Sequence, residues 1–209
     1  MKKIIITLIT GCLIVLVSCY SSSKITGSWK SPKQTDKTYK TIFIAALTGN
    51  TVAKSTIEND LEAMLSKYGI STTKSLDEFP PSFSRDSVQK DVLMQRVRKK
   101  GSEAILTVSL LKKETESRYT SGNYSPMGRW GYYNNFGGYY NYWYPYAYSD
   151  TYYTKDEIYY LETNLYDSVS EELVWSAQSQ TYSYNGLTSH SKEYSIMIGQ
   201  QLKKDGILK

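Results

Sequence analysis

The chain has 209 residues and a formal charge of +5, with 25 lysine and arginine residues against 20 aspartate and glutamate residues. That balance is too even for a nucleic-acid-binding protein, which concentrates basic residues on one face. The length suits a single domain with a sizeable hydrophobic core. The two cysteines, Cys12 and Cys19, both lie near the start of the chain.

Residues 1–18 have the layout of a secretion signal. Lys2 and Lys3 precede an apolar run of about 15 residues, fewer than the roughly 20 that a membrane-spanning helix needs. The run ends in Leu16-Val17-Ser18-Cys19, which resembles the lipobox of bacterial lipoproteins. The resemblance implies that residues 1–18 are removed and that Cys19 becomes the lipid-carrying first residue. A secreted protein with a cysteine at this place by coincidence is the alternative.

The same resemblance implies how the mature chain is anchored. A diacylglyceryl thioether plus an N-acyl chain on Cys19 supplies the two signals that stable membrane anchoring requires. Tyr20 follows where retained inner-membrane lipoproteins carry an aspartate, so the resemblance favours the outer membrane, with the domain facing the periplasm. Because Cys12 leaves with the signal, no disulfide and no thiolate metal site would remain. Residues 19–28 are predicted to be a lipidated tether, and residues 29–209 the domain.

The first half of the domain shows two strand–helix units in series. Each helix presents one apolar face, and each ends at a glycine, Gly69 or Gly101, before the next strand. Ser55 and Glu58 have capping-box spacing at the start of the first helix. The expected elements are a strand over 42–47, a helix to about 68, a strand over 70–76, a helix from 86 or 87 to 100, and a strand over 104–111.

Residues 119–153 form an insertion of unusual composition. They hold 12 of the 21 tyrosines of the chain, separated by glycine and asparagine. Tyrosine and tryptophan offer a large amphipathic contact area at low entropic cost, so they are enriched where proteins bind. The candidate binding surface consists of Tyr132, Tyr133, Tyr139, Tyr140, Tyr142, Trp143 and Tyr144.

Four interpretations of this insertion stay open. It is either a low-complexity loop, disordered or collapsed onto its own sheet, or one of three binding elements. As a binding element, its rings stack on sugars, dock a protein, or lie at the headgroup level of the membrane.

The second half of the domain is predicted to be a hairpin followed by a helix. Residues 158–167 alternate, with Tyr159 and Leu161 on one face, and the next strand runs to about Tyr184 with Trp175 in the core. The last helix spans 189–204. The fold class is therefore α/β (α+β): one domain with a mixed sheet of about five strands. Its order is strand–helix–strand–helix–strand, the insertion, then strand–strand–helix, with the helices packed on the sheet.

Three stretches of the mature chain carry a family resemblance. Ser28-Trp29-Lys30, the hairpin with Leu173-Val174-Trp175-Ser176, and the ending Gln201-Leu202-Lys203-Lys204-Asp205-Gly206 resemble a group of uncharacterised Gram-negative lipoproteins. The element order is also similar to small α/β domains of envelope-assembly proteins, such as the N-terminal domain of the Tol-system propeller protein and the curli-secretion lipoprotein. This is an analogy of fold, which does not by itself assign a function.

No set of residues converges on a reaction. The loop of residues 48–55 lacks the glycines of a phosphate loop, so it is expected to be an ordinary capped helix start. The only histidine, His190, is expected in a solvated first turn of the last helix. The carboxylate pairs Asp156-Glu157 and Glu171-Glu172 are expected to face water at strand ends. We therefore expect no catalytic residues, no metal and no cofactor.

The sequence predicts a membrane-anchored envelope lipoprotein that acts as a non-enzymatic binding or assembly module. Its partners would be the membrane, through the lipid on Cys19, and an envelope protein or glycan, but not nucleic acid. One alternative is a structural protein that self-associates through the tyrosine-rich segment. The other is a glycan-processing enzyme, which would need a cleft that holds a perturbed carboxylate.

Overall fold

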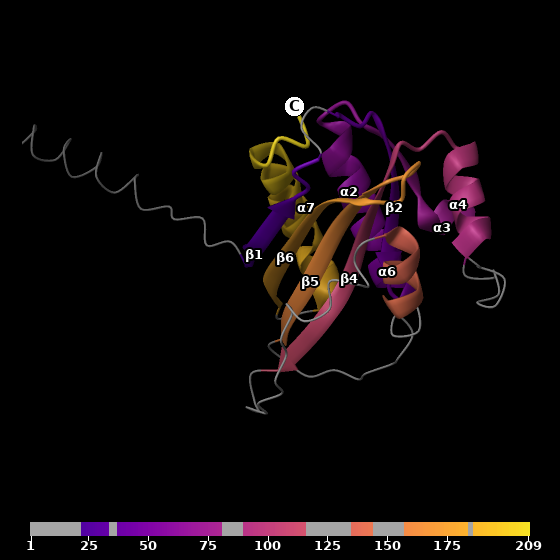
Figure 1. Cartoon of the computed structure of the whole chain (residues 1–209). Helices are drawn as coiled ribbons and strands as arrows, with labels where there is room; N and C mark the ends of the chain where they lie inside the picture. Colours follow the sequence, from indigo (N-terminus) through magenta and orange to yellow (C-terminus); the bar gives the residue numbers. More distant parts are fainter. Residues whose placement is uncertain (1–21, 34–36, 81–89, 116–134, 144–156, 184–185) are drawn as a thin grey trace, which may run out of the picture.

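The computed structural model describes residues 22–33, 37–80, 90–115, 135–143, 157–183 and 186–209. These form a single six-stranded mixed sheet with helices on both faces (Figure 1), which confirms the predicted α+β class. The strand order across the sheet is β1-β6-β5-β4-β2-β3. The strands are β1 (Ser23–Lys30), β2 (Thr41–Leu47), β3 (Ser71–Lys74), β4 (Ala104–Thr115), β5 (Glu157–Asp167) and β6 (Leu173–Ser183). The helices are α2 (Thr51–Ser66), α3 (Ser75–Glu78), α4 (Lys90–Lys99), α6 (Phe136–Trp143) and α7 (Leu187–Lys204).

Strand β1 is an element that the sequence did not reveal. It pairs antiparallel with β6 at the edge of the sheet, with Ser23 opposite Thr181 and Lys30 opposite Trp175. The prediction of a tether over residues 19–28 is therefore wrong from Ser23 onward, and the sheet has one strand more than predicted. Only Ile25 and Trp29 are large apolar residues in this strand. Such a polar sequence is typical of an edge strand, which faces water on one side.

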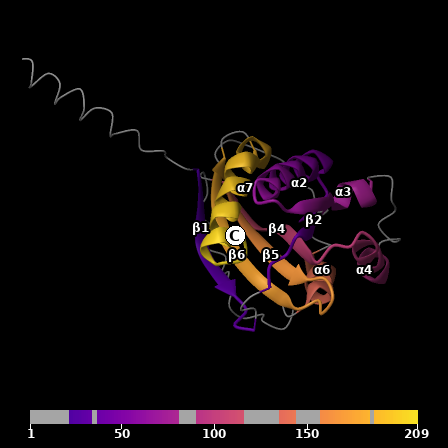
Figure 2. The ribbon, with the colours of Figure 1, turned by 90° about the horizontal axis from the view of Figure 1, so that it is seen from above.

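The larger core lies on the face of the sheet that α2 and α7 cover (Figure 2). β2 runs parallel to both β3 and β4, as two consecutive crossover connections require. The predicted last helix is present as α7, and its Tyr194, Ile198 and Leu202 are buried against the sheet. Trp175 is also fully buried, and its Nε1 donates a hydrogen bond to Asp205 at 2.7 Å.

The smaller core lies on the opposite face, under α4 and α6 (Figure 2). Leu93 and Val97 of α4 pack there with Phe43 of β2. Phe136 of α6 joins them, with its ring centroid 5.7 Å from that of Tyr166 on β5. A helix inside the tyrosine-rich insertion therefore covers part of the second face of the sheet.

The start of α2 differs from the predicted capping box. Asn50 caps the helix, and its side-chain oxygen accepts from the backbone N–H of Ala53 at 3.0 Å. Glu58 is fully buried instead, and it accepts backbone hydrogen bonds from Ala46 and from Leu76, both at 3.0 Å. The hydroxyl of Ser75 donates to the same carboxylate at 2.6 Å. These bonds hold the start of α3, so β3 ends at Lys74 rather than running to residue 76 as predicted.

Candidate functional site

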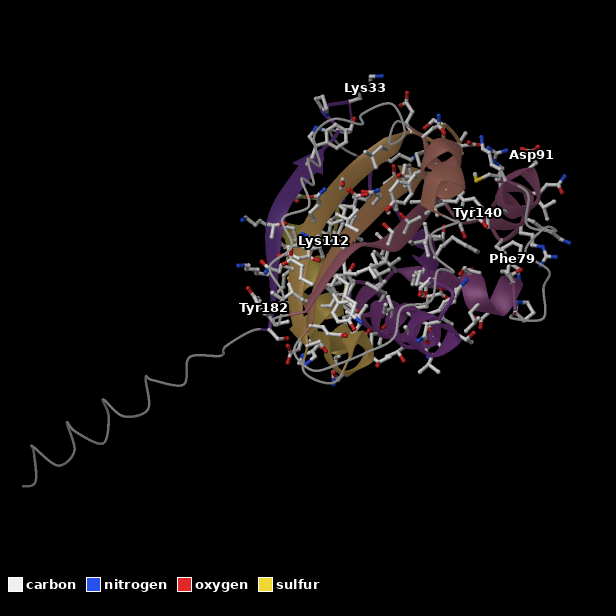
Figure 3. All side chains as sticks on the ribbon, turned by 90° about the horizontal axis from the view of Figure 1, so that it is seen from below. Lys33, Phe79, Asp91, Lys112, Tyr140 and Tyr182 are labelled. Carbon is white, nitrogen blue, oxygen red and sulfur yellow. The ribbon has the colours of Figure 1, made fainter. Side chains whose placement is uncertain are left out.

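The face of the sheet that carries α4 and α6 changes from apolar to polar across the strand order. Over β2 and the first part of β4 it is apolar and packs against α4 and α6, whereas over the last part of β4, most of β5, β6 and β1 it is polar. No helix among the described elements covers this polar part. Figure 3 shows Lys112 and Tyr182 on it, away from Tyr140 on α6. We call the residues that project here the polar strip: Lys24, Trp29, Lys112, Tyr160, Gln178, Gln180 and Tyr182.

Cross-strand pairing brings these side chains together. Gln180 of β6 lies opposite Tyr160 of β5 on one side and Lys24 of β1 on the other. Gln178, two residues earlier on β6, lies opposite Glu162 of β5. Paired residues of antiparallel strands share a face, so the two amides form a row along the middle of the polar strip.

Hydrogen bonds fix the geometry of this row. Gln180 Nε2 donates to the hydroxyl oxygens of Tyr182 at 2.9 Å and Tyr160 at 3.4 Å. The Tyr160 hydroxyl in turn donates to Glu114 at 2.9 Å. Burial and the bond to Glu114 raise the pKa of Tyr160 to about 12, so this hydroxyl stays a donor at neutral pH. The rings and the amide are thus held in place before any ligand arrives, which lowers the cost of binding.

The charges of the polar strip are largely balanced. Lys112 forms an ion pair with Glu114, and its Nζ lies 5.9 Å from the centroid of the Tyr160 ring. The hydrogen bond from Lys112 lowers the pKa of Glu114, which therefore stays ionised. Lys24 lies over the Tyr182 ring, with its Nζ 6.0 Å from the centroid. The strip consequently presents aromatic rings, amides and hydroxyls rather than a concentration of one charge.

Glu162 lies where the polar strip meets α6, and it is only 3% exposed. Gln178 Nε2 donates to its carboxylate at 3.2 Å, and Asn164 Nδ2 donates at 3.3 Å. The hydroxyl of Tyr139 on α6 supplies a further hydrogen bond. Burial raises the pKa of Glu162, although these hydrogen bonds lower it in part. The described neighbours of this carboxylate are amides and hydroxyls.

The predicted tyrosine surface is placed in part by the structure. Tyr139 and Tyr140 are 0% and 6% exposed and belong to the smaller core, so their rings are not available as an outer surface. This part of the insertion is collapsed onto its own sheet, which was one of the open interpretations. Tyr142 and Trp143 lie in the last turn of α6. The other predicted positions, Tyr132, Tyr133 and Tyr144, and the lipid site Cys19 lie outside the described residues.

His190 is not in a free, solvated turn. Its side chain is 20% exposed, and its Nδ1 lies 2.9 Å from the hydroxyl oxygen of Ser22. That hydroxyl has one proton and donates it to Glu193 at 2.5 Å, so His190 is the donor to Ser22. In a catalytic triad the histidine accepts the serine proton and the acid orients the histidine. The order here is reversed, and the group instead joins the start of β1 to α7.

The carboxylate pairs also differ from the prediction. Glu157 is 5% exposed and forms an ion pair with Lys113 at 2.5 Å, so the expectation that it faces water is wrong. Glu171 is bonded to two cations of α4, with its side chain 17% exposed. Glu172 faces water as predicted, with its side chain 60% exposed. Asp156 lies outside the described residues.

Two further properties concern only the described part of the chain. There, no group of three or more histidine, cysteine, aspartate or glutamate side chains is placed to hold a metal ion. Within the same residues, no helix combines the length and the apolar character that crossing a membrane demands.

Comparison with known proteins does not identify a family. No family model matches the chain, and no curated protein matches it. Among solved structures, it is similar to the PelC dodecamer from Paraburkholderia phytofirmans, with 13% identity, a TM-score of 0.44 and coverage of 86% of this chain and 97% of that chain. It is also similar to lipoprotein GNA1162 from Neisseria meningitidis, with 12% identity, a TM-score of 0.40 and coverage of 78% and 98%.

A third solved structure, a PDZ domain protein from Parabacteroides distasonis, has 10% identity and a TM-score of 0.44. The similarity covers 90% of this chain but only 37% of that one. One of these three proteins is a lipoprotein. The resemblance of the chain to a group of uncharacterised lipoproteins stays a prediction.

The sequence of β6 contains a pattern that indicates the polar strip. In β6, Ser176, Gln178, Gln180 and Tyr182 alternate with the buried residues of the same strand. Such alternation on a half-buried strand marks the residues of the exposed face. The pairing partners on β1 and β5 were not readable, because register depends on the tertiary fold and β1 was not recognised.

Proposed function

We propose that the protein is a lipid-anchored lipoprotein of the cell envelope that acts as a non-enzymatic binding module through the polar strip. The supporting observation is the arrangement of Trp29, Tyr160 and Tyr182 around a row of amides on a part of the sheet that no described helix covers. Aromatic residues are enriched at binding surfaces and charged residues are depleted at their centres. The polar strip has aromatic rings beside two uncharged amides, with its lysines on the outer strands, and the amides and tyrosines hold one another in position.

The proposed anchor lies close to one end of the polar strip. The carbonyl oxygen of Ser22 accepts a hydrogen bond from the backbone N–H of Tyr182 at 2.8 Å. Cys19 precedes Ser22 by three residues, and an extended chain covers about 11 Å over that distance. A lipid on Cys19 would therefore keep the Tyr182 end of the strip near a bilayer. Tyr20 favours the outer membrane and a domain that faces the periplasm.

The enzyme alternative has less support. Glu162 is the carboxylate with a raised pKa on this face, yet it is buried among Tyr139, Asn164 and Gln178. The group around His190 has the wrong order of hydrogen bonds for nucleophilic catalysis. A binding role needs neither an activated nucleophile nor an acid–base pair.

Photo-crosslinking in living cells tests the binding role. A photoreactive amino acid replaces Lys24 on the polar strip in the full chain, and a control variant carries it in place of Gln95, an exposed residue of α4. We expect an adduct at position 24 and none at position 95. Equal adducts at both positions, or none at either, contradict the proposal. An adduct between two copies of the chain supports self-association instead.

The anchor has its own test. In Cys19→Ala no lipid is attached, and the chain is expected to leave the membrane fraction for the periplasmic fraction. Ser21→Ala is the control, because it keeps the lipobox cysteine and should leave the distribution unchanged. Continued membrane association of Cys19→Ala would contradict anchoring through that residue.

A further inference from the structure

We propose that the polar strip binds an uncharged polysaccharide chain. This inference rests on the proposed function, since it names the ligand class of the same binding face. It follows from the side-chain types of the strip, their balanced charges and the shape of the sheet along β6.

The side chains of the polar strip match the two surfaces of a sugar ring. A pyranose has an apolar side formed by C–H bonds and a rim of hydroxyl groups. The face of an aromatic ring carries partial negative charge and attracts such C–H groups. Trp29, which is 37% exposed, offers the most accessible ring of the strip, and Tyr160 and Tyr182 are half-buried. Trp29 is therefore the accessible stacking platform, whereas a lysine lies over one face of each tyrosine ring.

The amides supply the complementary polar contacts. A glutamine side chain has two donor hydrogens and an acceptor oxygen. A sugar hydroxyl both donates and accepts, so glutamine can satisfy both of its needs. Gln178 and Gln180 have their Nε2 atoms directed to Glu162 and to the tyrosine hydroxyls, respectively. Among the described residues, neither carbonyl oxygen accepts a hydrogen bond, and both side chains remain half-buried at the surface. These oxygens are placed to accept from hydroxyl groups of a ligand.

A glycine keeps the centre of the polar strip unobstructed. Gly27 of β1 lies opposite Gln178, and a Cβ atom built on Gly27 meets no atom within 4 Å. On the same strand Trp29 lies opposite Ser176, one step along the same face. The amide of Gln178 is thus bordered by a position without a side chain and then by the indole ring, which suits a chain lying flat across the strands.

The charge of the strip distinguishes an uncharged ligand from an acidic one or a lipid surface. Lys112 is neutralised by Glu114, and Lys24, which lies over Tyr182, has no ion-pair partner among the described residues. Binding to anionic lipid headgroups uses several unpaired cations, each contributing about 1 kcal/mol. The exposed indole of Trp29 lies at the end of the strip opposite to Ser22. The proposed anchor, Cys19, precedes Ser22, so the indole is at the end away from the bilayer. The chemistry of the strip is complementary to hydroxyl groups rather than to phosphate or carboxylate.

Calorimetric titration of the full lipidated chain tests the ligand class, in a polyoxyethylene detergent so that no sugar headgroup competes. The probes are uncharged hexasaccharides of glucose and of N-acetylglucosamine, the acidic hexagalacturonate, and vesicles of phosphatidylethanolamine with phosphatidylglycerol. We expect binding of an uncharged hexasaccharide, and a loss of affinity of about tenfold or more in both Trp29→Ala and Gln180→Ala.

Matched controls keep the result interpretable. Ile196→Ala removes a comparably exposed apolar side chain from α7, and Gln95→Ala removes an exposed amide from α4, so neither should change affinity. Circular dichroism and the unfolding midpoint establish that each variant is folded. No binding of either uncharged probe, or binding that the strip variants leave unchanged, overturns the proposal.

The outcomes also separate this inference from the proposed function. Binding of hexagalacturonate or vesicles alone overturns the ligand class. If position 24 still forms a specific crosslink in the envelope, the binding module stands and only the sugar assignment fails. If position 24 forms no specific crosslink and no probe binds, both fail.

Discussion

The Tyr139 hydroxyl on α6 is hydrogen-bonded to the buried carboxylate of Glu162 on β5. The same hydroxyl is bonded to Ser109 of β4, so one side chain ties the helix to two neighbouring strands. A helix that packs on a sheet usually covers apolar residues, yet this contact is polar. Desolvation of a carboxylate costs free energy unless its hydrogen bonds compensate. Because Glu162 is buried at this contact, we expect the stability of the domain to depend on its protonation.

Glu162→Gln should make the protein more stable than wild type at neutral pH but not at acidic pH. Burial raises the pKa of Glu162 in the folded state. Its stabilising contribution is complete below the pKa of the unfolded state and is lost as pH rises through the folded pKa. Glutamine keeps the size and hydrogen bonding but does not ionise, so near pH 4 the two proteins should agree within about 1 kcal/mol.

Urea unfolding of both proteins between pH 4 and pH 8 measures this effect. The quantity of interest is the difference in unfolding free energy between the two, because other titrating groups are common to both. Glu114→Gln is a control, since the hydrogen bond from Lys112 lowers the pKa of Glu114 and its pH trend should run the other way. A difference for Glu162→Gln that does not grow with pH would contradict the argument.

Tyr139→Phe should loosen α6 while the rest of the fold remains intact. It removes the hydroxyl from Glu162 and Ser109, leaving two buried polar groups short of a partner at a cost of about 1–3 kcal/mol. Hydrogen exchange of the α6 amides should accelerate, whereas exchange in α2 should not change. Tyr68→Phe, on the opposite face of the sheet, is the matched control. Equal acceleration in both helices would mean that α6 opens only with the whole domain.

Glu58→Ala should destabilise the domain by about 3 kcal/mol, because it leaves the N–H groups of Ala46 and Leu76 without their acceptor. Burial raises the pKa of Glu58, so this loss should be present at acidic pH as well, where the protonated carboxyl still accepts. The unfolding midpoint in urea measures it. Asp60→Ala changes a carboxylate on the same helix that is not buried, and it should cost less than about 0.5 kcal/mol.

Glu58 illustrates why the sequence predicted the helices and strands better than the side-chain contacts between them. The helix around it was predicted from its apolar face, which is a local pattern, and α2 has that face. The carboxylate looked like a capping residue because its spacing from Ser55 fits that motif. Its actual partners on β2 and α3 are known only once the chain has folded. The same applies to Glu157, whose ion pair with Lys113 joins residues far apart in the sequence.

In the candidate site, too, local patterns were predictable from the sequence and tertiary contacts were not. Tyr139 and Tyr140 were noticed for their composition, but composition does not distinguish an exposed ring from a buried one. The α6 helix buries both rings against β4 and β5, a result of tertiary packing. The polar strip escaped notice because it is assembled from β1, β4, β5 and β6, and the β1 sequence has little apolar periodicity. The strands β4, β5 and β6 were predictable one by one, whereas β1 and the face that the four strands build together were not.

Gly199→Ala should destabilise the domain, although alanine is the better helix former. α7 crosses α2 at this glycine, and an added Cβ would overlap the side chain of Met64. The gain of about 1 kcal/mol in helix propensity is opposed by an overpacking cost of about 1–3 kcal/mol, so we expect a net loss of about 1 kcal/mol. Urea unfolding measures it.

A double variant identifies the cause of that loss. Met64→Ala alone should cost about 2–5 kcal/mol, because it opens a cavity in the larger core. If overlap with Met64 is the reason, adding Gly199→Ala to that background should stabilise the protein, since space is then available for the new methyl group. Ser195→Ala on the same helix is a control in which no glycine contact changes. Strictly additive losses of Met64→Ala and Gly199→Ala would show that the two residues do not interact.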